Sequence, residues 1–108
     1  METNMNLAGA VHEIDDFGRL LLPINLRSHL DWHPGDWLVP YTDTDAKMMF
    51  IHKNGGKHIK IDSHGRILIT PELQSELDWQ PGSKIVIIKN GGLEQLVLQS
   101  TELFRRRS

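Results

Sequence analysis

Two arginines in this chain follow the same short motif, and an arginine side chain is well suited to binding phosphate or the edge of a guanine. The segments IDDFGRLLLP (14–23) and IDSHGRILIT (61–70) place Arg19 and Arg66 directly after Asp-x-x-Gly. A guanidinium group can donate a planar set of hydrogen bonds to phosphate or to guanine O6 and N7. It can equally form a weak surface ion pair with the aspartate of its own motif. The residues alone leave both interpretations open.

The Asp-x-x-Gly motifs are typical of tight turns. Asp15 and Asp62 can accept hydrogen bonds from backbone N–H groups, and Gly18 and Gly65 can adopt the positive φ that such turns often need. Apolar segments of strand character flank both motifs: 12–15 and 20–22 in one copy, 58–62 and 67–69 in the other. Each copy is therefore predicted to contain a hairpin.

The two motifs belong to a tandem duplication. Asp15 matches Asp62 at a shift of 47 residues (62 − 15), and the same shift aligns 30–32 with 77–79, both Leu-Asp-Trp. Two copies are too few for a solenoid and favour a closed pair about a pseudo-two-fold axis. The predicted organisation is a tail at 1–11, a first repeat at 12–53, a linker at 54–57, a second repeat at 58–100 and a basic tail at 101–108.

Further elements follow each turn. Proline opens a short amphipathic helix in each copy, and two more apolar segments follow the Asp-Trp-x-Pro-Gly turn. The expected helices are 23–30 and 71–77, and the expected strands are 37–41, 48–52, 84–88 and 95–99. Trp32 and Trp79 are repeated beside apolar leucines, which indicates a place in the core. The predicted fold is mostly β with short helices, built from two ββαββ repeats.

Composition narrows the function classes. The 108 residues include no cysteine, so disulfides, thiolate catalysis and cysteine-ligated zinc are excluded. The start of the chain is unlike a signal peptide and no window suits a membrane span, so we expect a cytoplasmic protein with no membrane partner. The net charge of −2 argues against strong nonspecific DNA binding, although a local basic face is compatible with it.

Catalytic and metal sites have little support. No carboxylate pair, Ser-His constellation or phosphate loop is recognisable, so we expect no enzymatic activity and no cofactor. His29 and His33 have the i, i+4 spacing of a helical metal-ligand pair. His33 precedes Pro34, where the helix should end, and the second copy has Glu76 and Gln80 at the equivalent places. Surface histidines, and no metal site, are therefore predicted.

The segment IDDFGRLLLPINLRSHLDWHPGD resembles the AbrB/SpoVT/MazE superfamily of bacterial regulators. Its module reads Asp-x-x-Gly-Arg, a hydrophobic stretch, Pro-x-x-Leu-Arg and then Gly-Asp. The resemblance covers nearly the whole chain in two copies, an arrangement similar to that of MraZ-like proteins. It implies that two ββαββ units exchange hairpins to build one pseudo-two-fold barrel, and that arginine-bearing turns and helices form a DNA-binding face.

Carried over residue by residue, the resemblance implies DNA contacts by Arg19, Arg66 and the helical Arg27, and we add Lys60 as a fourth candidate. The second copy departs from the pattern, because Gln74 stands in place of Arg27 and Thr70 in place of Pro23. One half of the DNA-binding face would then be weaker than the other.

The leading hypothesis is a cytoplasmic, DNA-binding transcriptional regulator whose partner is double-stranded DNA. The alternative is a protein-interaction module such as an antitoxin or assembly scaffold, favoured by the acidic balance. The short basic end of the chain (101–108) argues against a toxin-wrapping segment and offers a further phosphate contact. A second copy of the chain, a toxin or another protein are the other candidate partners.

Overall fold

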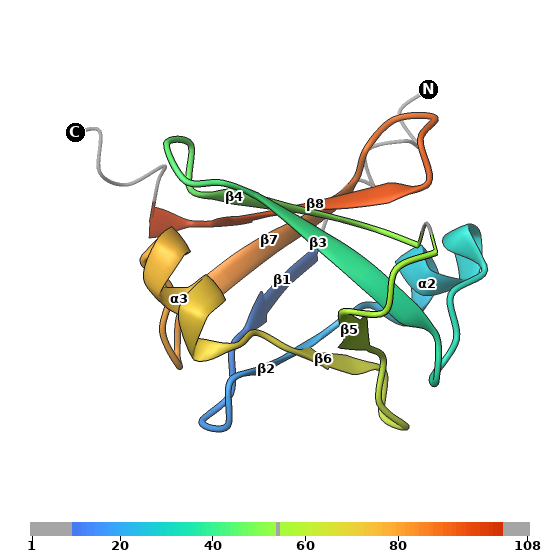
Figure 1. Ribbon diagram of the computed structural model, residues 1–108, viewed down its shortest axis with the longest axis horizontal. Helices are drawn as coiled ribbons and strands as arrows, with labels where there is room; N and C mark the ends of the chain where they lie inside the picture. Colours follow the sequence, from blue (N-terminus) through green and yellow to red (C-terminus); the bar gives the residue numbers. More distant parts are fainter. Residues whose placement is uncertain (1–9, 54, 103–108) are drawn as a thin grey trace.

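The computed structural model describes residues 10–53 and 55–102 (Figure 1). The first half contains β1 (Ala10–Glu13), β2 (Arg19–Leu21), α2 (Ile24–Leu30), β3 (Trp37–Asp43) and β4 (Met48–His52). The second contains β5 (Ile59–Lys60), β6 (Arg66–Leu68), α3 (Pro71–Leu77), β7 (Lys84–Lys89) and β8 (Gln95–Ser100). The expectation of a mostly β chain with short helices is confirmed.

The strands form two antiparallel layers. Six of them make one sheet in the order β1-β7-β8-β4-β3-β5, which curls into a half-barrel. The other two, β2 and β6, pair only with each other and lie across the open side of that sheet (Figure 1). The helices α2 and α3 lie at opposite ends of this ribbon.

The first two strands of each half pair only with strands of the other half. β1 pairs with β7 and β5 pairs with β3, and the pairs Glu13↔Lys84 and Lys60↔Trp37 are equivalent under the shift of 47. The β2–β6 ladder is centred on Leu20↔Ile67, and the β4–β8 ladder on Phe50↔Val97. Both central pairs join equivalent positions of the two copies, so the register follows a two-fold pseudosymmetry.

The local hairpins expected from the sequence are not paired hairpins. β1 and β2 belong to different sheets, and their turn keeps a single hairpin bond, from Asp15 N to Arg19 O at 2.9 Å. The equivalent bond in the second half runs from Asp62 N to Arg66 O at 2.9 Å. Alternating apolar residues specify which face of a strand is buried but not which strand is its neighbour, which is why the sequence pattern misled here.

The core fills the space between the half-barrel and the ribbon. The two repeated tryptophans are buried, Trp32 at 2% and Trp79 at 4% exposed, as predicted, whereas Trp37 is 36% exposed. The other buried apolar residues are Ile14, Leu20, Leu22, Leu26, Leu30, Leu38, Met49, Ile51, Ile59, Ile61, Ile67, Ile69, Leu77, Ile85, Ile87, Leu96 and Leu98. The ribbon thus contributes Leu20 and Ile67 to the same core as the sheet.

The helix boundaries lie close to those expected. Both helices end at an aspartate in the left-handed region, Asp31 and Asp78, each with φ of 60°. β1 begins at Ala10, two residues inside the segment predicted as a tail. Residues 1–9 and 103–108, most of the two predicted tails, lie outside the described residues. No helix in the described part of the chain is long and apolar enough to cross a membrane.

Candidate functional site

Both Asp-x-x-Gly motifs form the same aspartate-anchored turn. Asp15 Oδ1 accepts hydrogen bonds from the backbone N–H groups of Phe17 (2.9 Å) and Arg19 (2.8 Å). Asp62 Oδ1 accepts the equivalent bonds from His64 and Arg66, both at 2.8 Å. The turn glycines have φ of +83° and +81°, values that residues other than glycine rarely adopt. This geometry agrees with the prediction that the aspartates accept backbone N–H bonds and the glycines adopt a positive φ.

Strand pairing brings the two turn arginines onto one surface. In the β2–β6 ribbon, Arg19 lies opposite Leu68, and Arg66 lies opposite Leu21. The intervening pair, Leu20 and Ile67, points into the core, so the arginines must project from the outer side. We call this outer side, with the turns 15–19 and 62–66, the turn face. It lies at the bottom of the view in Figure 1.

Each arginine pairs with a turn aspartate. Arg19 Nε lies 3.2 Å from Asp15 Oδ2, and Arg66 Nε lies 3.5 Å from Asp62 Oδ2. Arg66 Nη1 also lies 3.8 Å from Asp15 Oδ2, so it bridges the two turns. The arginine side chains remain 34% and 27% exposed. The ion-pair interpretation therefore describes the isolated chain, while partly exposed guanidinium groups remain within reach of an external acceptor.

The turn hydrogen bonds stabilise the charged form of both aspartates. The backbone N–H of Arg19, with those of Phe17 and the Arg19 charge, holds the pKa of Asp15 below its ordinary value of 3.8, although desolvation opposes them. At Asp62, desolvation alone would raise the pKa. The backbone N–H groups of Arg66 and His64 and the charge of Arg66 outweigh it, so the pKa is lowered. Both turns carry a carboxylate near neutral pH.

The charges of the turn face nearly cancel. Arg19, Arg66 and nearby Lys60 are offset by Asp15 and Asp62 and by the exposed Asp16, while Lys60 Nζ lies 5.6 Å from the Trp37 ring centroid. Cations over an indole ring are attracted by its electron-rich face. The turn face is therefore not a strongly basic patch, and any anion that binds it must be recognised by a few directed donors.

The tips of the two turns differ in chemistry. Phe17, at the first tip, is 74% exposed, and the Arg19 guanidinium lies 4.9 Å from its ring centroid. The second tip carries His64, whose Nδ1 lies 3.4 Å from Arg66 Nη2. Sequence reasoning overlooked Phe17, although an aromatic residue at the tip of a tight turn is itself a signal of exposure.

Arg27, expected to contact DNA, is only 8% exposed. Its Nε donates to Leu22 O at 2.9 Å, and its guanidinium covers Gly65, where a Cβ would come within 2.6 Å of Nη2. Gln74 does the same in the other half, because its Nε2 donates to Ile69 O at 2.7 Å and covers Gly18. This geometry favours a positioning role for Arg27, in which each helix supports the turn of the opposite half.

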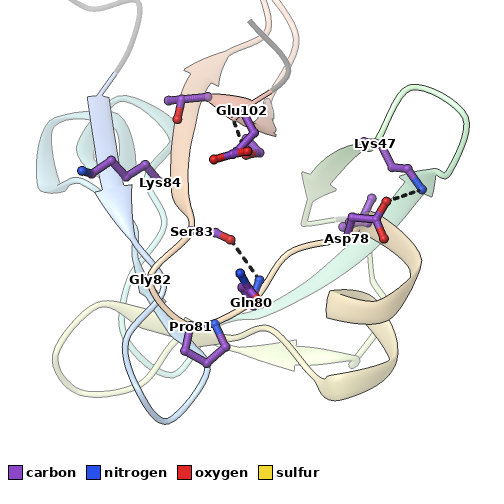
Figure 2. Close-up of a pocket in the computed structure, with 11 residues that line it drawn as sticks. Lys47, Asp78, Gln80, Pro81, Gly82, Ser83, Lys84 and Glu102 are labelled. Carbon is purple, nitrogen blue, oxygen red and sulfur yellow. Dashed lines mark hydrogen bonds and ion pairs between the residues drawn. The ribbon is translucent and has the colours of Figure 1, made fainter. Parts of the chain in front are cut away.

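An open hollow of about 750 Å³ lies at the end of α3. Lys47 and Asp78 stand on one side of it and Lys84 on the other (Figure 2), with a Lys47–Asp78 ion pair of 3.2 Å. Small-molecule sites are usually more enclosed and more apolar. In the first half of the chain, the amine of Lys53 occupies the place equivalent to this hollow, and its Nζ lies 2.9 Å from Asp36 Oδ2.

Metal-ligating side chains do not gather in the part of the chain that the structure describes: no three His, Asp or Glu residues lie together there. His33 is 66% exposed and lies beside Asp31 and Asp36. The predicted surface position of this histidine is thus confirmed.

Comparison with known proteins adds no relative from which to carry over a role. No protein-family model matches the chain, and no curated protein is significantly similar to it.

Proposed function

We propose that the protein is a DNA-binding transcriptional regulator of AbrB-like type that contacts DNA through its turn face. The observation that carries this proposal is the meeting of Arg19 and Arg66, 47 positions apart, on the outer side of one two-stranded ribbon. A ligand that lies along this ribbon would meet both guanidinium groups.

The proposed architecture is a swapped-hairpin barrel. Its support is the pairing of each half's first strand with the third strand of the other half, β1 with β7 and β5 with β3. In such an arrangement neither half owns a complete sheet, and both turns are held in a fixed relation by the shared β2–β6 ribbon. Two equivalent contacts would then be presented to the two-fold symmetric backbone of a DNA duplex.

The proposed contacts are made by the outer nitrogens of the guanidinium groups. Among the described residues, Arg19 hydrogen-bonds its aspartate through Nε, which leaves Nη1 and Nη2 to donate to a phosphate or a guanine edge. The aspartate would orient the guanidinium, so that less side-chain entropy is lost on binding. Lys60 would add a longer, less directed phosphate contact. Arg27 would act through Gly65, by holding the second turn.

The test is binding of wild type and of an Arg19→Ala/Arg66→Ala variant to genomic fragments, including the protein's own upstream region, by fluorescence anisotropy at several salt concentrations. The variant should lose affinity, and the slope of log K against log salt should become shallower by about 0.9 for each lost phosphate contact. Its unfolding temperature should stay near that of wild type, because exposed ion pairs contribute little.

The matched control is Lys84→Ala/Lys89→Ala, which removes the same charge from β7. It should leave DNA affinity nearly unchanged if the turn arginines act by direct contact. Equal affinities of wild type and the arginine variant would refute the assignment of Arg19 and Arg66.

A protein-interaction module is the second candidate, favoured by apolar exposure on the same turn face. Phe17 is 74% and Leu68 47% exposed there, and the charges nearly cancel. Exposed aromatic residues flanked by arginine are common anchors of protein interfaces. Failure of the wild-type protein to bind any fragment at low salt would make this module, an antitoxin or scaffold, the preferred function.

A further inference from the structure

The six-stranded sheet has a second face that points away from the core, on which the apolar side chains are half-buried to exposed. Side chains alternate along each strand, so the neighbours of the buried residues point away from the core. On four adjacent strands, one row of these outward residues is apolar: Tyr41 of β3, Phe50 of β4, Val97 of β8 and Ile88 of β7. They are direct cross-strand neighbours, which makes the row continuous. We call this side the outer sheet face.

The apolar row is extended and lacks charge at its centre. Val86 and Val11 add a second pair on β7 and β1, and Val11 is 54% exposed. Tyr41 is 65% exposed. Charged side chains occur at the rim, where Lys84 lies 3.9 Å from Glu13. Contiguous apolar patches above a few hundred Å² are uncommon on monomeric proteins and mark contact surfaces.

We infer that the outer sheet face is an interface between two copies of this chain. The face repeats itself about its own centre, because Phe50 and Val97 are equivalent positions, as are Tyr41 and Ile88. An uncharged, self-similar surface needs no complementary charge on its partner, and a second copy presents the same surface in the same size. Where two sheets pack face to face they lie about 10 Å apart, and the curl of this sheet limits such packing to its central strands.

The size of the face sets the strength of the association. Five strands about 4.8 Å apart, each about five residues long at roughly 3.4 Å per residue, span a plane of about 400 Å². Two copies would bury less than about 800 Å² of plane, because the sheet curls into a half-barrel and its outer face is convex, and this lies below the size of standard specific interfaces. We therefore expect a weak, reversible dimer with a dissociation constant well above micromolar, since interfaces of about 1,600 Å² already extend to micromolar affinity.

The interface does not depend on the proposed DNA contact. The outer sheet face lies on the far side of the half-barrel from the β2–β6 ribbon (Figure 1). Dimerisation would leave both turn faces open and directed away from each other. A dimer that also binds DNA could thus hold two separate duplexes.

The test is analytical ultracentrifugation of the full chain over a wide concentration range. Wild type should pass from monomer to dimer and no further, because the face is used up in one contact. Tyr41→Lys should raise the dissociation constant about tenfold or more, since it places a charge in the apolar row. Phe50→Thr, which keeps strand propensity, should weaken the dimer without adding charge.

The matched control is Ile24→Lys, which changes an apolar side chain of α2 that is 61% exposed. It should dimerise like wild type, and all variants should melt cooperatively. A wild-type protein that stays monomeric at every concentration would overturn the inference, as would equal dimerisation by Tyr41→Lys. Dimerisation that appears only after deletion of residues 1–9 would overturn it too, because the chain's own N-terminal segment would then be the occupant.

Discussion

Arg27 and Gln74 occupy equivalent positions and make equivalent bonds to the backbone, although one carries a charge and the other does not. Arg27 Nε donates to Leu22 O, and Gln74 Nε2 donates to Ile69 O. A buried carbonyl that loses its donor costs about 1–3 kcal/mol. The shared role of the two residues is therefore to satisfy a carbonyl and to cover a turn glycine, and the positive charge of Arg27 is dispensable for it.

Arg27→Gln should retain most of the stability of wild type, whereas Arg27→Ala should lower the free energy of unfolding by about 1–3 kcal/mol. Chemical denaturation of both variants measures this difference. If Arg27 acts by positioning, Arg27→Gln should also bind DNA as wild type does. A large loss of affinity in a stably folded Arg27→Gln variant would instead restore the contact that the sequence resemblance implied.

Gly65 is constrained twice, by its positive φ and by the guanidinium above it. Gly82 has a comparable φ of +94° but nothing within 4 Å of a Cβ, so it reports the backbone cost alone. Left-handed backbone costs a non-glycine residue about 1–2 kcal/mol. Gly65→Ala should be more destabilising than Gly82→Ala in urea unfolding, and Arg27→Gln should relieve part of the difference. Equal destabilisation by Gly65→Ala and Gly82→Ala would show that the Arg27 side chain moves aside without a measurable cost in stability.

The sequence predicted the repeated turns better than it predicted the position of Arg27. Repetition of Asp-x-x-Gly-Arg was enough to single out Arg19 and Arg66, because a turn needs the aspartate and the glycine but not the arginine. It could not reveal that Arg27 is buried against Gly65, since the two lie in different copies and meet only through the fold. A single glutamine at position 74 was the available signal, because it shows that the position tolerates loss of charge.

The turns couple their geometry to the protonation of their aspartates. The pKa values of Asp15 and Asp62 are lowered in the folded protein. At pH values between the folded and the unfolded pKa, the unfolded chain therefore binds more protons than the folded protein does. Stability should therefore be fully present above the unfolded pKa, near 3.8, and should fall as the pH drops through the folded values. Thermal unfolding followed between neutral and strongly acidic pH measures this decline.

Asp15→Asn/Asp62→Asn should show a shallower decline, because neither turn then titrates. Some pH dependence should remain, since the backbone N–H of His33 and the Lys53 amine also lower the pKa of Asp36. Asp16→Asn, beside the first turn, is the control and should follow wild type. If the double variant loses stability at acidic pH as wild type does, the stability of the turns does not depend on the charge of the aspartates.

Elements were predictable where local chemistry decides them. Both helices begin beside a proline, and the strands from 37 and from 84 begin just after a Pro-Gly turn, as the residues indicated. The partners of the strands were not predictable in the same way. The three-residue β2 carries one inward side chain, Leu20, and nothing in that pattern distinguishes β1 from β6 as its neighbour.

Neither half of the molecule contains a self-sufficient sheet. The first half lacks partners for β1 and β2, and the second lacks them for β5 and β6. Residues 1–54 and 55–108, expressed separately, should each be largely unfolded by circular dichroism, because isolated they would expose the apolar faces that the other half covers. Mixing them should restore structure. A cooperative, monomeric melt of either half alone would contradict this expectation.

The duplication alone predicts that the two copies bury their apolar faces against each other, and the core does contain residues of both copies. Which strands cross between the copies was not predictable, because equivalent residues such as Leu20 and Ile67 satisfy the same pattern in either copy. The structure settles which strands pair, because Leu20 of β2 lies directly opposite Ile67 of β6.

The pairing of β1 with β7 also fixes when the protein can fold during its synthesis. Ala10 lies opposite Ile87, so the first strand leaves the ribosome 77 residues (87 − 10) ahead of its partner. Throughout that interval β1 has no native partner strand within its own chain. Long-range pairing of this kind slows folding. An unpaired β1 would favour pairing with the β7 of a second chain, which is a known route to domain-swapped molecules.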